Sequence, residues 1–176
     1  VWVENAFSKR EKGISINGLV WMNDIQEMEI EAFSKIEAGF DVIKIKVGAL
    51  DFDEECRLLE RIRKRHSAFK ITLRLDANGA FEPDTALEQI KELSRFEIHS
   101  IEQPIKPGRE ELEMICRQTK IPIALDEELI GFDLDKADTF IQKTKPSYLI
   151  IKPTLLGGLD RADNWVNVAQ KNHTGW

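Results

Sequence analysis

The sequence contains no run of eighteen apolar residues, few cysteines and no excess of basic charge. A helix that crosses a bilayer needs about 20 consecutive apolar residues, so the sequence predicts none. The net charge of -6 reflects 31 acidic and 25 basic residues. A mildly acidic chain lacks the basic surface with which proteins bind nucleic acid or anionic membranes. We therefore expect neither nucleic acid nor a membrane as a partner.

The chain has only two cysteines, Cys56 and Cys116. They lie far apart, in segments with helical periodicity, and without the close spacing that is typical of a zinc site. Two buried thiols in a reducing compartment are therefore favoured over a disulfide or a bound metal. This interpretation predicts a cytoplasmic protein.

Short apolar segments alternate with segments of helical periodicity along the chain. Start and stop signals separate them, among them Asn23 or Asp24 before the first helix, Gly39 after it and Pro83 in the third. Strict alternation implies parallel strands that are joined by right-handed crossovers and covered by helices. Strands are predicted at residues 14–20, 42–47, 70–76, 98–102, 122–127 and 148–152.

Two architectures fit this alternation, a doubly wound open sheet and a (β/α)8 barrel. The first strand is not followed by G-x-G-x-x-G, the motif that would favour a dinucleotide-binding sheet. In the second strand Ile43 and Ile45 share one face, and Lys44 and Lys46 share the other. Central strands of a doubly wound sheet are apolar on both faces, whereas barrel strands are apolar outward and carry functional residues at the inner rim. We predict an α/β fold of the TIM type, as a partial barrel of about six βα units.

The last inward position of five consecutive predicted strands is ionisable. We expect these side chains at the same height on the barrel rim, where adjacent strands are about 4.8 Å apart. Three of them are carboxylates, whose mutual repulsion calls for a cation. Oxygen ligands without histidine or cysteine favour Mg²⁺ or Mn²⁺ over zinc. The register leaves open whether Asp126 or Glu127 is the third ligand. The five residues are Lys46, Asp76, Glu102, Asp126 and Lys152.

Lys44 and Lys46 lie at alternate positions of one inward face. Burial of an ammonium group without a partner is costly, so this pair indicates a site. A neutral amine is a competent general base, and a divalent cation stabilises the negative charge that develops when a proton leaves a carbon next to a carboxylate. The alternative is that both lysines are structural members of ion pairs.

Five stretches together resemble the enolase superfamily, in the subgroup similar to muconate lactonizing enzyme that carries a K-x-K motif at the end of the second strand. They are KIKVG, LRLDANGAF, SIEQP, ALDEE and IIKPTLLGG, in the order of the family. The resemblance implies proton abstraction next to a carboxylate with help from Mg²⁺. It implies Asp76, Glu102 and Asp126 as metal ligands and Lys46 and Lys152 as the catalytic lysines, with Lys46 as general base. By the same resemblance, Lys44 and Asn78 support the site.

Within this subgroup, ISINGLVWM and IIKPTLLGG look most like the o-succinylbenzoate synthases of menaquinone biosynthesis. This resemblance implies a small-molecule carboxylate substrate and a syn-elimination of water. Lys46 would remove the proton and then assist departure of the hydroxyl group, while Lys152 would stay cationic beside the ring. The alternative is a dipeptide epimerase or N-acylamino acid racemase of the same superfamily, in which the two lysines act in turn as acid and base.

The family also has an N-terminal capping domain and eight βα units, whereas six are counted here. We therefore expect residues 1–176 to be a partial enolase-type barrel domain of a longer chain. A second alternative is that these residues alone form an inactive barrel fragment. The tryptophans are predicted to be packing residues; they are Trp2, Trp21, Trp165 and Trp176.

Overall fold

The computed structural model of the protein describes residues 4–176, so that Trp2 lies outside the described residues. Within this range one sheet has the order β1-β2-β3-β4-β5-β6, and all neighbouring strands are parallel. This order confirms the predicted succession of βα units. The strands are β1 (Gly18–Val20), β2 (Val42–Lys46), β3 (Thr72–Asp76), β4 (Ser100–Glu102), β5 (Ile123–Leu125) and β6 (Tyr148–Leu149).

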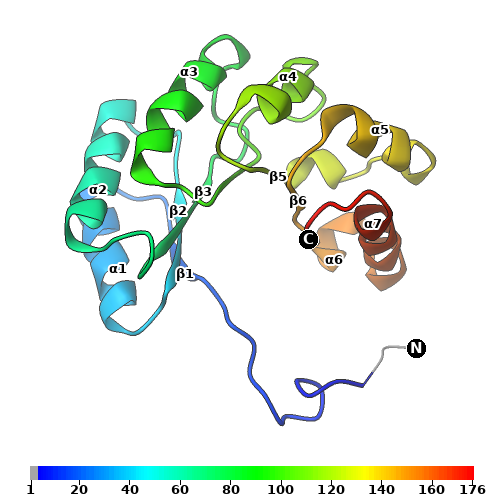
Figure 1. Ribbon diagram of the computed structural model, residues 1–176, viewed down its shortest axis with the longest axis horizontal. Coiled ribbons are helices and arrows are strands. Elements are labelled where there is room, and N and C mark those ends of the chain that lie inside the picture. The colour runs from blue at the N-terminus through cyan, green and yellow to red at the C-terminus, as the bar shows by residue number, and fades with distance from the viewer. Residues whose placement is uncertain (1–3) are drawn as a thin grey trace.

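Helices lie along the outer side of the curved sheet, so that the molecule has the shape of an arc of a barrel wall (Figure 1). This arrangement is the predicted one. The main helices are α1 (Ile25–Glu37), α2 (Phe52–Arg65), α3 (Pro83–Leu93), α4 (Glu111–Gln118), α5 (Ala137–Thr144) and α7 (Leu159–Lys171). Shorter elements are α6 (Pro153–Leu156) and the 3-10 turns η1 (Ser94–Phe96), η2 (Glu127–Leu129) and η3 (Leu134–Lys136).

Local signals set the helix boundaries. Of the two candidate caps before α1, Asp24 is the one used, because its carboxylate accepts hydrogen bonds from the backbone N–H groups of the first turn at 3.0 and 3.1 Å. Asp51 caps α2 in the same way. Pro83 occupies the first turn of α3, where its missing N–H costs nothing. Gly39, just after α1, has a φ of 93° that other residues rarely adopt.

The apolar core lies between the outer face of the sheet and the helices. Ile43, Ile45 and Val47 of the second strand segment are buried there, whereas Lys44 and Lys46 on the opposite face are partly accessible. The predicted difference between the two faces of this strand is therefore confirmed. Helices contribute further buried side chains, which include Met28, Leu59, Ile62, Ile90, Leu112, Ile141 and Trp165.

Two of the tryptophans do not pack as predicted. Trp165 is completely buried and lies 5.8 Å from the ring centroid of Phe132. Trp21 and Trp176, by contrast, are 61% and 63% exposed, so the prediction is wrong for both. Trp21 directly follows β1 at the rim of the sheet, and Trp176 lines the inner face. Neither position is covered by the helices outside the sheet.

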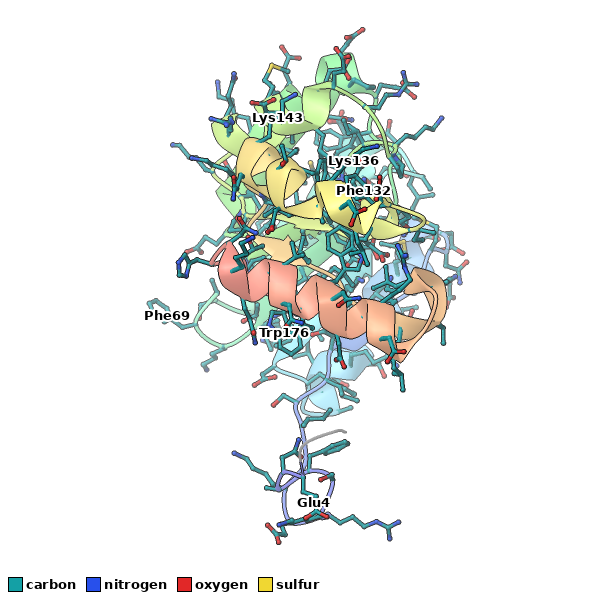
Figure 2. All side chains as sticks on the ribbon, turned by 90° about the vertical axis from the view of Figure 1, so that its right-hand side faces the viewer. Glu4, Phe69, Phe132, Lys136, Lys143 and Trp176 are labelled. Atoms are coloured by element: carbon teal, nitrogen blue, oxygen red, sulfur yellow. The ribbon has the colours of Figure 1, made fainter. Side chains whose placement is uncertain are left out.

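The first strand is shorter than predicted. Pairing between β1 and β2 begins at Gly18, opposite Ile43, and residues 14–17 precede this point without strand structure. Ile14 and Ile16 are consequently exposed. The segment that begins near Glu4 extends away from the body of the molecule in both views (Figures 1 and 2). A second protruding side chain, Phe69, lies on the loop before β3 (Figure 2).

Both cysteines are free thiols; Cys56 is buried and Cys116 is half-buried. Burial raises the pKa of the Cys56 thiol to about 11 and that of Cys116 to about 12. Both side chains are therefore protonated at neutral pH. Across residues 4–176, no helix is both long and apolar enough to cross a membrane.

Candidate active site

The candidate site lies at the C-terminal ends of the strands. The sheet register pairs Lys46 with Asp76 and Asp76 with Glu102, so these three residues lie at one level. Glu102 pairs with Ala124, two residues before Asp126. Asp126 therefore lies one inward position further along its strand. Ala124 in turn pairs with Tyr148, four residues before Lys152, so Lys152 lies two inward positions further. The prediction of a common height is therefore wrong for Asp126 and Lys152, because the strands of a barrel are staggered relative to one another.

The three predicted metal ligands are buried. Asp76 is 0% exposed, Glu102 5% and Asp126 3%. A carboxylate that loses its hydration to this extent needs a cation or hydrogen-bond donors to stay ionised. The environment of the three acids is therefore decided by the lysines around them.

Lysine side chains link the carboxylates in a row. Lys44 Nζ lies 2.9 Å from Asp76 Oδ2 and 2.6 Å from Glu102 Oε2. Lys152 Nζ lies 3.5 Å from the other oxygen, Glu102 Oε1, and also contacts Asp126 Oδ2. Each neighbouring pair of carboxylates thus shares one ammonium group. The structure thus places the three acids in one row, each next to a lysine that also contacts its neighbour.

The pKa values in this row follow from competition between burial and charge. Burial opposes the charged form of Lys44, but hydrogen bonds to Glu102 and Asp76 outweigh it and the pKa of Lys44 is raised. The pKa of Lys152 is raised in the same way, against burial, by Asp126. Burial acts against ionised Asp76 too, yet its lysine partners hold the pKa of Asp76 below the ordinary value. Burial and the charge of Asp76 raise the pKa of Glu102 despite its contact with Lys44. Glu102 is therefore harder to ionise than its neighbour Asp76.

Three groups surround the ammonium group of Lys46. Its Nζ lies 2.8 Å from Asp76 Oδ2 and 2.5 Å from Asn78 Oδ1. The ring of Trp21 lies on another side, with 5.2 Å between its centroid and Nζ. Sequence reasoning missed Trp21 as a site residue. Its position directly after the first strand, at the rim that carries the ionisable residues, is the signal that could have found it.

The side chains of the three consecutive acids after β5 contact three different partners. Asp126 contacts Lys152. Glu127 Oε1 accepts a hydrogen bond from Asn78 Nδ2 at 2.7 Å. Glu128 is buried and accepts one from the backbone N–H of Gly108 at 3.0 Å. In this arrangement Asp126 lies in the row of carboxylates, and Glu127 stands beyond Asn78.

Gln103 is a second residue that sequence reasoning missed. It follows Glu102, is completely buried and has a left-handed φ of 39°. Its Oε1 accepts hydrogen bonds from the backbone N–H groups of Asp126 at 3.2 Å and Glu128 at 3.1 Å. Its Nε2 donates to the carbonyl of Ile105 at 3.0 Å. Gln103 therefore holds the ends of β4 and β5 at a fixed separation.

Glu55 organises the loop after the K-x-K segment. This buried carboxylate on α2 accepts hydrogen bonds from the backbone N–H groups of Gly48 at 2.7 Å and Leu50 at 3.2 Å. Gly48 has a φ of 92°, and a Cβ at this position would lie 2.6 Å from Cβ of Ala80. Only glycine fits there. Burial is the main reason that the pKa of Glu55 is raised.

The donor set of the row suits a divalent cation. Three buried carboxylates supply only oxygen ligands, which are those that Mg²⁺ and Mn²⁺ prefer. Among residues 4–176, however, no three acidic, histidine or cysteine side chains converge closely enough to hold one metal ion. The ammonium groups of Lys44 and Lys152 stand between the carboxylates instead. They compensate the same negative charge that a bound cation would compensate.

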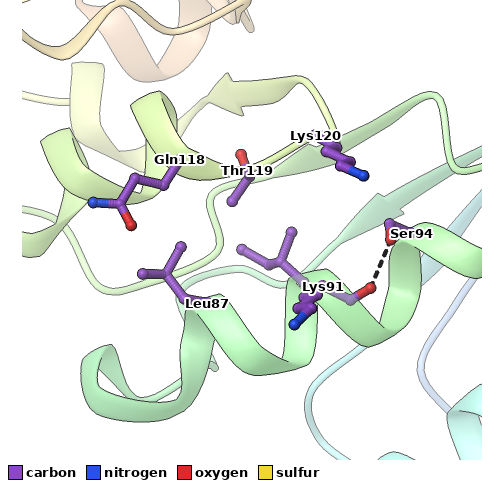
Figure 3. Close-up of a pocket in the computed structure, with 7 residues that line it drawn as sticks. Leu87, Lys91, Ser94, Gln118, Thr119 and Lys120 are labelled. Atoms are coloured by element: carbon purple, nitrogen blue, oxygen red, sulfur yellow. Dashed lines mark hydrogen bonds between the residues drawn. The ribbon is translucent and has the colours of Figure 1, made fainter.

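Two cavities differ in their relation to the row. One of about 310 Å³ opens on the inner face of the sheet, and Lys44, Glu102 and Trp176 are among its lining residues. The other, of about 440 Å³, lies between α3 and the segment after α4 (Figure 3). Its lining includes Lys120, which precedes β5, whereas Asp126 follows that strand. The second cavity is therefore at the opposite end of the sheet from the carboxylates.

Known proteins share both the sequence and the fold. The chain is 40% identical to the o-succinylbenzoate synthase of Desulfotalea psychrophila over 99% of its own length and 48% of the relative. The crystal structure of MenC from the same organism matches with a TM-score of 0.90 and 39% identity, again over 99% of this chain and 48% of that one. The dipeptide epimerase of Cytophaga hutchinsonii, in complex with Mg and the dipeptide D-Ala-L-Val, matches with a TM-score of 0.83 and 26% identity over 95% of this chain and 46% of that one.

The chain thus spans about half the length of these relatives. Their solved structures contain the same parallel strands and outer helices, which confirms the predicted barrel architecture of this part. The family model for enolase C-terminal domain-like proteins matches residues 27–176, a range that includes all the predicted site residues. This chain belongs to the enolase C-terminal domain-like family of the enolase superfamily.

Proposed function

We propose that residues 1–176 are part of the catalytic barrel domain of a longer Mg²⁺-dependent lyase, an o-succinylbenzoate synthase of menaquinone biosynthesis. The observation that carries this proposal is the row of three buried carboxylates with Lys46 at one end and with Lys44 and Lys152 between neighbouring acids. The 40% identity to an o-succinylbenzoate synthase over nearly the whole chain supports the choice of reaction.

Asp76, Glu102 and Asp126 would hold the cation, which supplies positive charge opposite the substrate carboxylate. Lys46 takes the proton from the carbon next to that carboxylate, since it lies at one end of the row. The same ammonium group then donates the proton to the departing hydroxyl group, so that water leaves from the face of the ring that lost the proton. Lys152, which lies between Glu102 and Asp126, remains charged and stabilises the electrons of the developing enolate.

Epimerase chemistry is the second candidate, and the placement of the two lysines favours it as an alternative. Lys46 pairs with Asp76, whereas Lys152 lies further along the row and contacts Glu102 and Asp126. Two amines on either side of a substrate carbon can remove a proton from one face and return one to the other. The dipeptide epimerase named above is a relative with this fold.

An assay of the full-length protein tests the proposal. With Mg²⁺ we expect turnover of the hydroxy-cyclohexadiene carboxylate to o-succinylbenzoate, and loss of turnover in Lys46→Ala and Lys152→Ala with Mg²⁺ binding retained. Incubation of an N-acylamino acid or dipeptide in D₂O provides the comparison. Exchange of its α-hydrogen from both faces, without elimination of water, would instead identify an epimerase or racemase.

A further inference from the structure

A hydrogen-bonded path leads from Lys46 through Asn78 to Glu127. Asn78 Oδ1 lies 2.5 Å from Lys46 Nζ, and Asn78 Nδ2 lies 2.7 Å from Glu127 Oε1. We propose that Glu127 is a positioning residue, which fixes the side-chain amide of Asn78 and thereby aims the amine of Lys46 at the substrate. This inference rests on the proposed function, in which Lys46 is the base.

Chemistry alone decides which way the amide of Asn78 points. An ammonium group can only donate hydrogen bonds, and an ionised carboxylate can only accept them. While Lys46 is charged, the amide oxygen must therefore face it and the amide nitrogen must face Glu127. The reverse orientation would set an N–H group against the ammonium group and an oxygen against the carboxylate. Without Glu127, only the contact with Lys46 would favour the observed orientation of the Asn78 amide.

Packing does little to hold Asn78 in place. The residue is exposed and adopts a left-handed φ of 45°, a conformation that asparagine tolerates better than most residues. Its backbone N–H donates to Asp76 Oδ1 at 3.2 Å, which anchors the main chain but leaves the amide free to rotate. The orientation of the amide is consequently set by its two side-chain partners.

This orientation determines where Lys46 can act. A neutral amine has two N–H groups and one lone pair. Asp76 Oδ2 at 2.8 Å and Asn78 Oδ1 at 2.5 Å accept both N–H groups, so the lone pair is directed away from these two residues. If the amide of Asn78 were reversed, its N–H group would occupy the lone pair and block proton abstraction.

Glu127 carries a further sign of a role beyond stability. Its second oxygen, Oε2, is buried and has no hydrogen-bond partner among the described residues. A buried acceptor without a partner is destabilising, because it has lost its hydrogen bonds to water. A side chain that served stability alone would gain from satisfying this oxygen, whereas orienting Asn78 requires only Oε1.

Glu127→Ala and Glu127→Gln in the full-length protein test this role, with the exposed Glu88→Gln on α3 as matched control. A glutamine oxygen can still accept the N–H group of Asn78, so we expect kcat to fall in the order wild type, Gln, Ala. For Glu127→Ala we expect a loss of about 10-fold or more, part of the roughly 10²–10⁴-fold that a general base contributes. Exchange of the substrate α-hydrogen in D₂O, followed by NMR, should slow in parallel with kcat.

Three further measurements separate orientation from other roles. We expect KM, the Mg²⁺ affinity measured by calorimetry and the melting temperature to stay close to wild type in both variants. A parallel fall in Mg²⁺ affinity would make Glu127 a metal ligand and would overturn the inference, as would unchanged kcat in Glu127→Ala. A lower kcat together with a higher KM and a lower melting temperature would show a structural role, and would also overturn the inference. An inactive wild-type protein would refute the proposed function, and the inference with it.

Discussion

The side-chain oxygen of Gln103 accepts a hydrogen bond from the backbone N–H of Asp126 at 3.2 Å. This contact joins the residue after β4 to the residue after β5, and so sets the separation between two of the three candidate metal ligands. A buried amide with several partners is a rigid connector, because each hydrogen bond that is broken leaves an unsatisfied group.

Replacement of Gln103 should therefore affect both stability and metal binding. In Gln103→Ala the backbone N–H groups of Asp126 and Glu128 lose their acceptor. Since each of the two unsatisfied buried groups costs about 1–3 kcal/mol, we expect a loss of about 2–6 kcal/mol in the free energy of unfolding. Urea titration of the full-length protein measures the loss, and calorimetry should show weaker Mg²⁺ binding. The exposed Gln118→Ala serves as control. Equal stability of both variants would contradict the connecting role.

Removal of one carboxylate from the row should weaken metal binding. Glu102→Gln deletes a charge between Lys44 and Lys152 and leaves only two of the three acids. Mg²⁺ at 100 times its Kd should stabilise the wild-type protein by about 2.7 kcal/mol, and EDTA should reverse this gain. We expect the variant to lose the stabilisation at the same Mg²⁺ concentration. Thermal melts with and without Mg²⁺ measure the difference. The exposed Glu110→Gln should retain the wild-type response.

Glu55 should make stability depend on pH. Its raised pKa means that the folded state holds this proton up to a higher pH than the unfolded state, whose carboxyl has the ordinary value of 4.5. Between the two values the folded state binds more protons, so its stability falls as pH rises through this window. Glu55→Gln keeps an acceptor for the loop and should remove this part of the pH dependence. Urea titrations from pH 4 to pH 7 provide the measurement.

The alanine variant separates charge from hydrogen bonding at the same position. Glu55→Ala leaves the N–H groups of Gly48 and Leu50 without their acceptor. We expect it to be less stable than Glu55→Gln at every pH, by about 1–3 kcal/mol. Identical curves for the glutamine variant and the wild type would show that Glu55 does not contribute to the pH dependence.

Trp21 should assist Lys46 without supporting the fold. The ring lies 5.2 Å from Lys46 Nζ and is 61% exposed, so Trp21→Ala should leave the melting temperature close to wild type. A cation–π contact at an exposed site is worth about 0.5–1 kcal/mol, which corresponds to a change of about 2–5-fold in kcat/KM. Trp21→Phe keeps an aromatic face and should lose less. Steady-state kinetics of the wild type and the two variants measure the effect. The prediction is wrong if kcat/KM of Trp21→Ala equals that of the wild type or that of Trp21→Phe.

Much of the barrel could be predicted because its signals are local. Alternation along β2 separates buried Ile43 and Ile45 from Lys44 and Lys46, and this difference depends only on the period of a strand. The helix cap at Asp24 and the stop at Gly39 likewise require only neighbouring residues. The acids were found for a related reason, since parallel strands all end at the same rim of the sheet.

The prediction was less accurate where the path of a loop or the edge of the sheet decides the outcome. Residues 14–17 have a strand-like sequence but precede the point at which β1 meets β2. Trp21 has a large apolar side chain of the kind that usually packs in a core, yet it follows β1 at the open rim and lies against Lys46. Neither result depends on local propensity.

The order of strands and helices, the inward face of each strand and the acids at the strand ends follow from the sequence by itself, because periodicity and capping act over a few residues. Only the tertiary structure decided which partner each acid takes: Asp126 meets Lys152, while Glu127 meets Asn78. Such pairing depends on the stagger between strands and on connections that Gln103 makes across them. These contacts join residues more than twenty positions apart, over distances that only the folded chain brings within reach of a hydrogen bond.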